Sequence, residues 1–170
     1  MTRVRSSSWG AALLLLALTP LAGAQGVIVK RNAEAGKPFS STIWAGDTLY
    51  VSGTLAEATL PPGAAPGSRP TLSGDTRAQT QSALSSIQKT LKEQGLDMGD
   101  IVQMRVYLAG DPVLSGKMDF AGMNAAYGQF FGTKEQPNKP VRAAVQVAAL
   151  ALPTALVEIE VTAVRSTPSK

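Results

Sequence analysis

Helical spacing of apolar residues predicts two helices in this chain. The first is expected between Asp75, a predicted N-cap, and Gly95, which is placed to end it. Its buried stripe consists of Thr80, Leu84, Ile87 and Leu91. The second helix is expected from about Met118 to Phe131, where Gly132 closes it.

Runs of β-branched and alternating residues predict strands around these helices. They cover residues 27–29, 41–44, 48–53, 101–108, 142–149 and 156–164. Residues 41–53 are expected to form a hairpin, and the strand at 101–108 is expected to place Val102 on the same face as Met104. The order hairpin, helix, strand, helix, strand, strand indicates an α+β domain with two helices on one face of a small sheet.

The first 24 residues are typical of a secretory signal peptide. Arg3 and Arg5 form a positive start, residues 11–18 form an apolar run, and small residues at 22–24 precede the expected cleavage. The run is too short for a membrane-spanning helix, which needs about 20 apolar residues. We therefore expect a single domain at residues 25–170, which is periplasmic or secreted and has no membrane contact after cleavage.

The composition excludes several kinds of catalytic site. The 170 residues include no cysteine and no histidine, which excludes a Ser-His-Asp triad, a thiol nucleophile, a disulfide framework and a zinc site built on imidazole or thiolate. The net charge is +4, of which the two leader arginines supply half, and no basic cluster is present. We therefore expect no nucleic-acid partner. Acid–base chemistry has to come from carboxylates, lysine, tyrosine, hydroxyls or the backbone.

Three polar positions stand out from this background. Arg142 follows Pro140 at the start of a predicted strand, where it could bind a carboxylate through two parallel hydrogen bonds or form a surface ion pair. Glu158 and Glu160 share one face of the last strand, either to orient and deprotonate water or as part of a solvated face. Asn124 adjoins the stripe of the second helix and either donates to a ligand or is solvated.

Five short motifs occur in a fixed order along residues 38–165. They are Tyr50-Val51-Ser52-Gly53, Gly99-Asp100-Ile101-Val102 with Val106-Tyr107-Leu108, Asp119-Phe120 with Asn124 and Tyr127, Pro140-Val141-Arg142, and Val157-Glu158-Ile159-Glu160. As an ordered set they resemble the Rid family, the YjgF-type reactive intermediate deaminases.

The resemblance implies a chorismate-mutase-like fold, in which a mixed sheet carries two helices on one face. It also implies a homotrimer whose sheets form a barrel, with ligand sites between subunits. The implied activity is hydrolysis of imino acids such as 2-iminobutanoate and 2-iminopropanoate to 2-oxo acids and ammonia, with no metal or other cofactor. Two alternatives remain open: a trimer that binds a small carboxylate without turnover, and a chaperone-like or interaction protein that uses the long Pro/Gly-rich loop at residues 54–74.

The same resemblance implies roles for individual residues. Arg142 would bind the substrate carboxylate, and Glu158 would orient the attacking water. The implied substrate-binding residues are Ser52, Gly53, Asn124 and Phe39. Phe39 follows Pro38 where the family usually has tyrosine, and Ala144 stands where the family often has cysteine.

Overall fold

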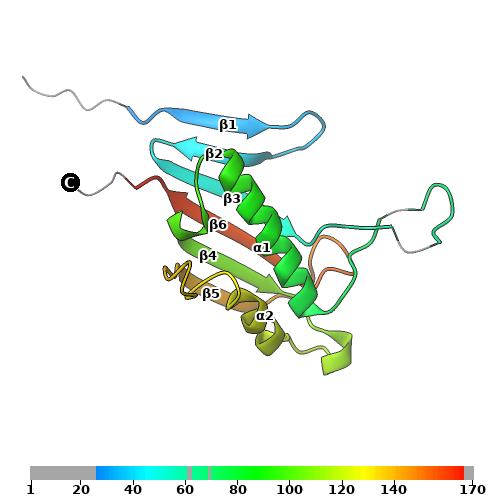
Figure 1. The fold of residues 1–170 in the computed structure, drawn as a ribbon. Helices are drawn as coiled ribbons and strands as arrows, with labels where there is room; N and C mark the ends of the chain where they lie inside the picture. Colours follow the sequence, from blue (N-terminus) through cyan, green and yellow to red (C-terminus); the bar gives the residue numbers. More distant parts are fainter. Residues whose placement is uncertain (1–25, 61–62, 69, 167–170) are drawn as a thin grey trace, which may run out of the picture.

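The computed structural model describes residues 26–60, 63–68 and 70–166, and the expected leader at 1–24 lies outside them (Figure 1). The helices are α1 (Thr76–Glu93) and α2 (Phe120–Tyr127), with short 3-10 turns η1 (Met98–Asp100) and η2 (Pro112–Leu114). The strands are β1 (Val29–Ala33), β2 (Ser40–Ala45), β3 (Thr48–Leu55), β4 (Ile101–Leu108), β5 (Val141–Gln146) and β6 (Val157–Val164).

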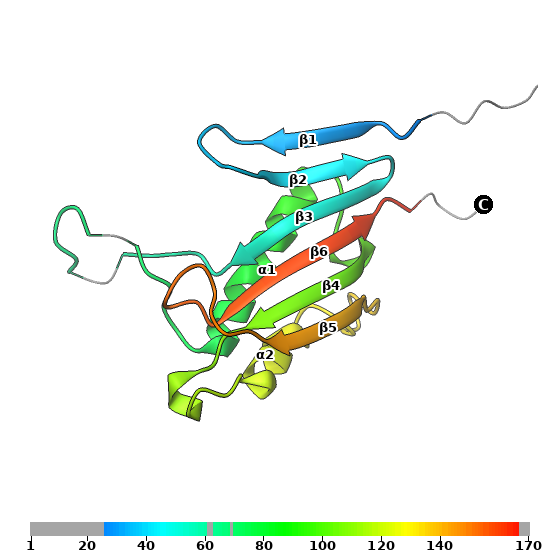
Figure 2. The same ribbon diagram turned by 180° about the vertical axis from the view of Figure 1, so that it is seen from behind.

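The strands form one mixed sheet in the order β1-β2-β3-β6-β4-β5. The neighbours β4 and β5 run parallel, and the other neighbouring pairs run antiparallel. Both helices cover the same face, and the view from behind shows the opposite face with no described helix over it (Figure 2). The predicted α+β class and the two helices on one face are therefore confirmed.

The core lies between β6 and α1. Four alternate residues of β6 are at most 3% exposed, namely Val157, Ile159, Val161 and Ala163. They pack in one cluster with the stripe of α1, where Leu84, Ile87 and Leu91 are fully buried. Burial of each large aliphatic side chain contributes about 1.5–3 kcal/mol, so this contact is a main source of the sheet's stability.

Local signals at both ends of α1 act as the sequence predicts. The Asp75 carboxylate accepts a hydrogen bond from the backbone N–H of Ala78 at 2.8 Å. Gly95 has a φ of +74°, a left-handed conformation that ends the helix. The backbone N–H of Leu96 then donates to the Leu91 carbonyl at 2.9 Å.

The second helix is shorter than the predicted range of residues 118–131. It ends at Tyr127 and is followed by Gly128, a residue type that is unfavourable in helices. Beyond it the backbone N–H groups of Gln129 and Phe130 donate to carbonyls three residues earlier, as in a 3-10 turn. Phe131 is nevertheless buried, so the apolar stripe continues into these turns.

The prediction that Val102 shares the buried face of β4 is wrong. Ile101 is 3% exposed, whereas Val102 is 46% exposed. Ile101 pairs with Ala163 and Gln103 with Thr162, so an extra residue in β4 forms a bulge. A bulge shifts by one residue the alternation of side chains between the two faces of the sheet. The sequence of one strand does not reveal this shift, because the bulge depends on the partner strand.

Two predicted strand boundaries also differ from the structure. The edge strand β1 covers Val29–Ala33 instead of residues 27–29, and β5 ends at Gln146 instead of residue 149. β1 is exposed throughout and is aligned by its pairing with β2, where Lys30 lies opposite Trp44. Its extent therefore depends on its neighbour more than on an apolar pattern of its own.

A buried amide joins α1 to the loops at one end of the sheet. Gln79 is 1% exposed, and its side-chain nitrogen donates to the carbonyls of Gly74 at 3.3 Å and Thr154 at 3.0 Å. Its side-chain oxygen accepts from the backbone N–H of Leu156 at 2.9 Å. Because Leu156 immediately precedes β6, this amide holds the start of the central strand.

We expect Gln79→Leu to lower the free energy of unfolding by about 2–4 kcal/mol, because buried backbone groups lose their partners. Gln81→Leu is the matched control, since Gln81 lies on the same helix and is exposed. Its effect should stay within about 0.5 kcal/mol. Urea denaturation of both variants measures the difference, and equal losses would contradict the role assigned to Gln79.

Candidate functional site

Arg142 lies on the helix-covered face of the sheet. Its strand partner Met104 is buried in the core, and its guanidinium reaches α2. Nη2 donates to Asn124 Oδ1 at 2.8 Å, and the guanidinium carbon lies 4.3 Å from the ring centre of Tyr127. Among the described residues the ion pairs are Glu34–Lys37 and Arg105–Glu160, and neither involves Arg142. We call Asn124, Tyr127 and Arg142 the arginine cluster.

Tyr127 leaves the charge of Arg142 uncompensated. Burial raises the pKa of the Tyr127 phenol, and the nearby Arg142 guanidinium opposes that shift only in part. The ring is therefore neutral at pH 7 and offers the cation its π face. Tyr127 lies three positions after Asn124, which places both side chains on one side of α2.

Glu158 lies on the opposite, helix-free face. It alternates with the buried residues of β6 and lies across from Leu55 and Tyr107 on the neighbouring strands. Its carboxylate rests against Gly53, where an added Cβ would overlap Oε1 of Glu158. Glycine at this position therefore permits the close approach of the carboxylate.

Ser52 and Gly53 lie beside this carboxylate, whereas Phe39 lines a cavity that Glu158 does not line. Ser52 and Gly53 form a bulge in β3 opposite Glu160, and the Ser52 hydroxyl donates to the Ser40 carbonyl at 2.8 Å. Phe39, Ser52 and Gly53 line a cavity of about 320 Å³, to which the Glu34–Lys37 ion pair also contributes. The motif positions did not point to that ion pair. We call Ser52, Gly53 and Glu158 the glutamate cluster.

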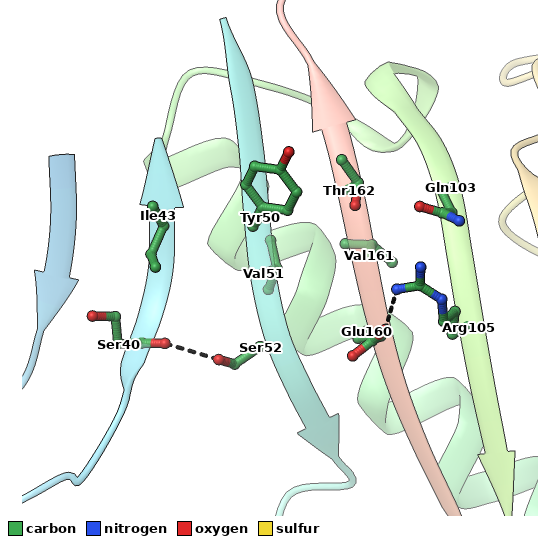
Figure 3. A pocket seen from close by; sticks show the side chains of 10 residues that line it. All are labelled: Ser40, Ile43, Tyr50, Val51, Ser52, Gln103, Arg105, Glu160, Val161 and Thr162. Carbon is green, nitrogen blue, oxygen red and sulfur yellow. Dashed lines mark hydrogen bonds and ion pairs between the residues drawn. The ribbon is translucent and has the colours of Figure 1, made fainter. Parts of the chain in front are cut away.

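The two glutamates of β6 have different surroundings. Glu160 accepts from Arg105 of β4 across a shallow cavity of about 230 Å³, which Tyr50 and Ser52 also line (Figure 3). This hydrogen bond raises the pKa of the Arg105 guanidinium. No ion pair engages Glu158 among the described residues. Glu160 is thus already paired, whereas Glu158 has no ion-pair partner in the part of the chain that the structure describes.

The sheet separates the two clusters within one chain. Glu158 on β6 pairs with Tyr107 on β4, and Tyr107 pairs in turn with Val145 on β5. Arg142 lies three residues before Val145 on the same strand. Standard strand geometry places Arg142 about 10 Å away along the strands and about 10 Å across them, on the other face. The structure therefore brings Arg142 together with Asn124, and Glu158 together with Gly53, but does not bring Arg142 and Glu158 together in one chain.

The described residues contain no group of three acidic, histidine or cysteine side chains that could hold a metal ion. Within the same residues, no helix is long and apolar enough to cross a bilayer.

Comparison with known proteins places this chain among relatives that share its fold and most of its length. The family model described as endoribonuclease L-PSP matches residues 30–165. A RutC family protein of Haemophilus influenzae is 32% identical over 128 residues, which cover 75% of this chain and 87% of that protein. An Escherichia coli K12 protein named "Putative reactive intermediate deaminase TdcF" is 37% identical over 92 residues, which cover 54% of this chain and 65% of that protein.

The fold is also found in a solved structure. The crystal structure of E. coli TdcF with bound serine matches with a TM-score of 0.60 and 28% identity. The match covers 84% of this chain and 99% of TdcF. By its sequence, its motifs and its fold, the chain belongs to the endoribonuclease L-PSP family, the Rid family that its ordered motifs indicate.

Proposed function

We propose that this protein hydrolyses small 2-imino acids to 2-oxo acids and ammonia. The observation that carries the proposal is the pair of clusters. One has a guanidinium and the other a carboxylate, and neither group forms an ion pair among the described residues. The name of TdcF and the serine in its crystal structure support the same chemistry, because serine bears an α-carboxylate. The imino acids 2-iminobutanoate and 2-iminopropanoate are small members of this class.

Each cluster supplies one part of the reaction. Arg142 pairs with the substrate carboxylate, and Asn124 holds the guanidinium in place for that contact. Glu158 holds a water molecule against the imine carbon and accepts a proton as the C–O bond forms. Glu158 returns that proton to the imine nitrogen, which completes the carbinolamine. It then moves the carbinolamine hydroxyl proton to the same nitrogen as the C–N bond breaks, so that ammonia leaves and the 2-oxo acid remains. No step needs a metal or an organic cofactor.

The site is proposed to form between subunits of a homotrimer. One chain holds its two clusters on opposite faces of the sheet, so a complete site needs the arginine cluster of one copy and the glutamate cluster of another. The helix-free face also exposes apolar side chains that such an assembly would cover. These are Tyr50, Val141 and Val145.

Two other functions are less well supported. Binding of a carboxylate without turnover would use Arg142 in the same way but would assign no role to Glu158. The family description names an endoribonuclease. Histidine, the residue used most often for acid–base catalysis, is missing from this sequence, and we therefore favour imine hydrolysis over RNA cleavage.

We expect Arg142 to matter most for binding and Glu158 for turnover. Arg142→Ala should weaken binding of 2-oxobutyrate by about 10- to 100-fold, since charge-assisted hydrogen bonds contribute about 1.5–3 kcal/mol. Arg142→Lys should restore this only in part, because an ammonium lacks the planar fork. Glu158→Gln should leave affinity nearly unchanged and lower the rate by about 10²–10⁴. Calorimetry and ammonia release from freshly generated imino acids measure the two effects.

Glu160→Gln is the matched control, because it makes the same change two residues away on the same face. It should keep the rate within a few-fold of wild type, since Glu160 is engaged by Arg105. If Arg142→Ala binds 2-oxobutyrate as tightly as wild type does, Arg142 is not the residue that binds the substrate carboxylate. A wild-type rate for Glu158→Gln would favour binding without turnover.

We expect Gly53→Ala to lower the rate by at least about tenfold while it leaves 2-oxobutyrate affinity nearly unchanged. The added methyl group would occupy the position of the Glu158 carboxylate and displace it from the water. Gly128→Ala is the control, because the nearest atom to its Cβ would be the Asn124 carbonyl oxygen at 3.5 Å, an ordinary contact. A crystal structure of Gly53→Ala with Glu158 unmoved and full activity would contradict this assignment.

We expect a trimer by light scattering, and activity from mixed trimers of two inactive variants. When Arg142→Ala and Glu158→Gln chains assemble at random, about a quarter of the interfaces combine an intact Arg142 with an intact Glu158. Coexpression should therefore recover about a quarter of wild-type activity. A monomer in solution, or a trimer without recovery, would contradict a site shared between subunits.

A further inference from the structure

A third cavity lies at the opposite edge of the sheet from Arg142. It has a volume of about 630 Å³, within the range of about 300–1,000 Å³ that is usual for small-molecule sites. It forms where β1 and β2 extend past the end of α1 (Figure 1). None of the residues assigned to imine hydrolysis lines it.

The polar lining of this cavity is held in place by specific contacts. Trp44 Nε1 donates to Gln94 Oε1 at 2.9 Å, and the guanidinium carbon of Arg165 lies 4.4 Å from the centre of the Trp44 ring. Lys30 lies directly opposite Trp44 in the β1–β2 pairing. The backbone N–H of Arg165 donates to the Asp47 carbonyl at 2.9 Å, which anchors the end of β6 beside the cavity.

The cavity carries an excess of positive charge. Lys30 and Arg165 both line it and form no ion pair within the described parts of the chain. Asp47 also lines it, but lies beyond ion-pair distance of both cations. Stacking on Trp44 occupies the face of the Arg165 guanidinium and leaves its N–H edge free for an anion.

One wall of the same cavity is apolar. Val27 and Ile28 line it and are 68% and 72% exposed. Trp44 is the other large apolar surface, and its N–H is already engaged by Gln94. A ligand that satisfies both the cations and this wall has a negative group attached to an apolar body.

We propose that this cavity binds a small aromatic monocarboxylate. The carboxylate lies between Lys30 and the free edge of Arg165, and the aromatic ring packs against Trp44, Val27 and Ile28. This site is separate from the one proposed for imine hydrolysis and does not depend on it.

Fluorescence of Trp44 tests the proposal directly. In full-length protein carrying Trp9→Phe, Trp44 is the only tryptophan. Phenylacetate should change its emission saturably. Acetate, which lacks the ring, and phenylacetamide, which lacks the charge, should bind at least about tenfold more weakly.

Charge variants test the assignment of residues. Lys30→Gln and Arg165→Gln should each weaken phenylacetate binding by about two- to fivefold, as expected for partly exposed charge contacts, and Arg165→Lys should restore part of the loss. Lys89→Gln is the matched control, because Lys89 is exposed on α1 and does not line the cavity. Arg142→Ala should bind phenylacetate at this site as the parent does.

The proposal fails if phenylacetate causes no saturable change, or if phenylacetamide binds equally well. It also fails if Lys89→Gln weakens binding as much as Lys30→Gln and Arg165→Gln do. A change in Trp44 emission that is lost in Arg142→Ala would assign the ligand to the other site and overturn the proposal as well.

Discussion

The alternation of β6 between two faces is the constraint on which the rest of the structure depends. β6 lies between β3 and β4, and its apolar residues form the core with α1. The same alternation sends Glu158 and Glu160 to the helix-free face. A slip of one residue in register would move the carboxylates into the core and the apolar residues into solvent. Stability of the fold and placement of the candidate base therefore have the same cause.

Because the sheet is a single layer with helices on one side, it also separates the two candidate functional side chains. Arg142 faces α2, whereas Glu158 faces away from the helices, and the backbone of the sheet stands between them. One chain therefore carries both the Arg142 guanidinium and the Glu158 carboxylate, but the two groups cannot contact the same small substrate. Assembly of copies would bury the apolar residues of the helix-free face and complete the site in one step, which links the proposed trimer to the proposed activity.

The two arginines proposed to bind anions share one physical arrangement. Arg142 stacks on Tyr127 at 4.3 Å and Arg165 on Trp44 at 4.4 Å, and neither pairs with a carboxylate within the described parts of the chain. An aromatic ring orients a guanidinium without neutralising it, so the hydrogen-bonding edge stays available. Arg105, by contrast, is paired with Glu160 and is not available to a ligand in this way.

Much of this protein could be predicted from its sequence, because the signals involved are local. The Asp75 cap, the stripe of α1, the hairpin and the alternation of β6 each depend on residues within one element. The bulges at Val102 and at Ser52–Gly53 were not predictable in this way, because a bulge exists only in the pairing of two strands.

The sequence likewise did not determine which side chains contact Arg142. Only the tertiary structure decided that it lies against Asn124 and Tyr127, and on the face of the sheet away from Glu158, because pairing of distant segments determines which side chains meet.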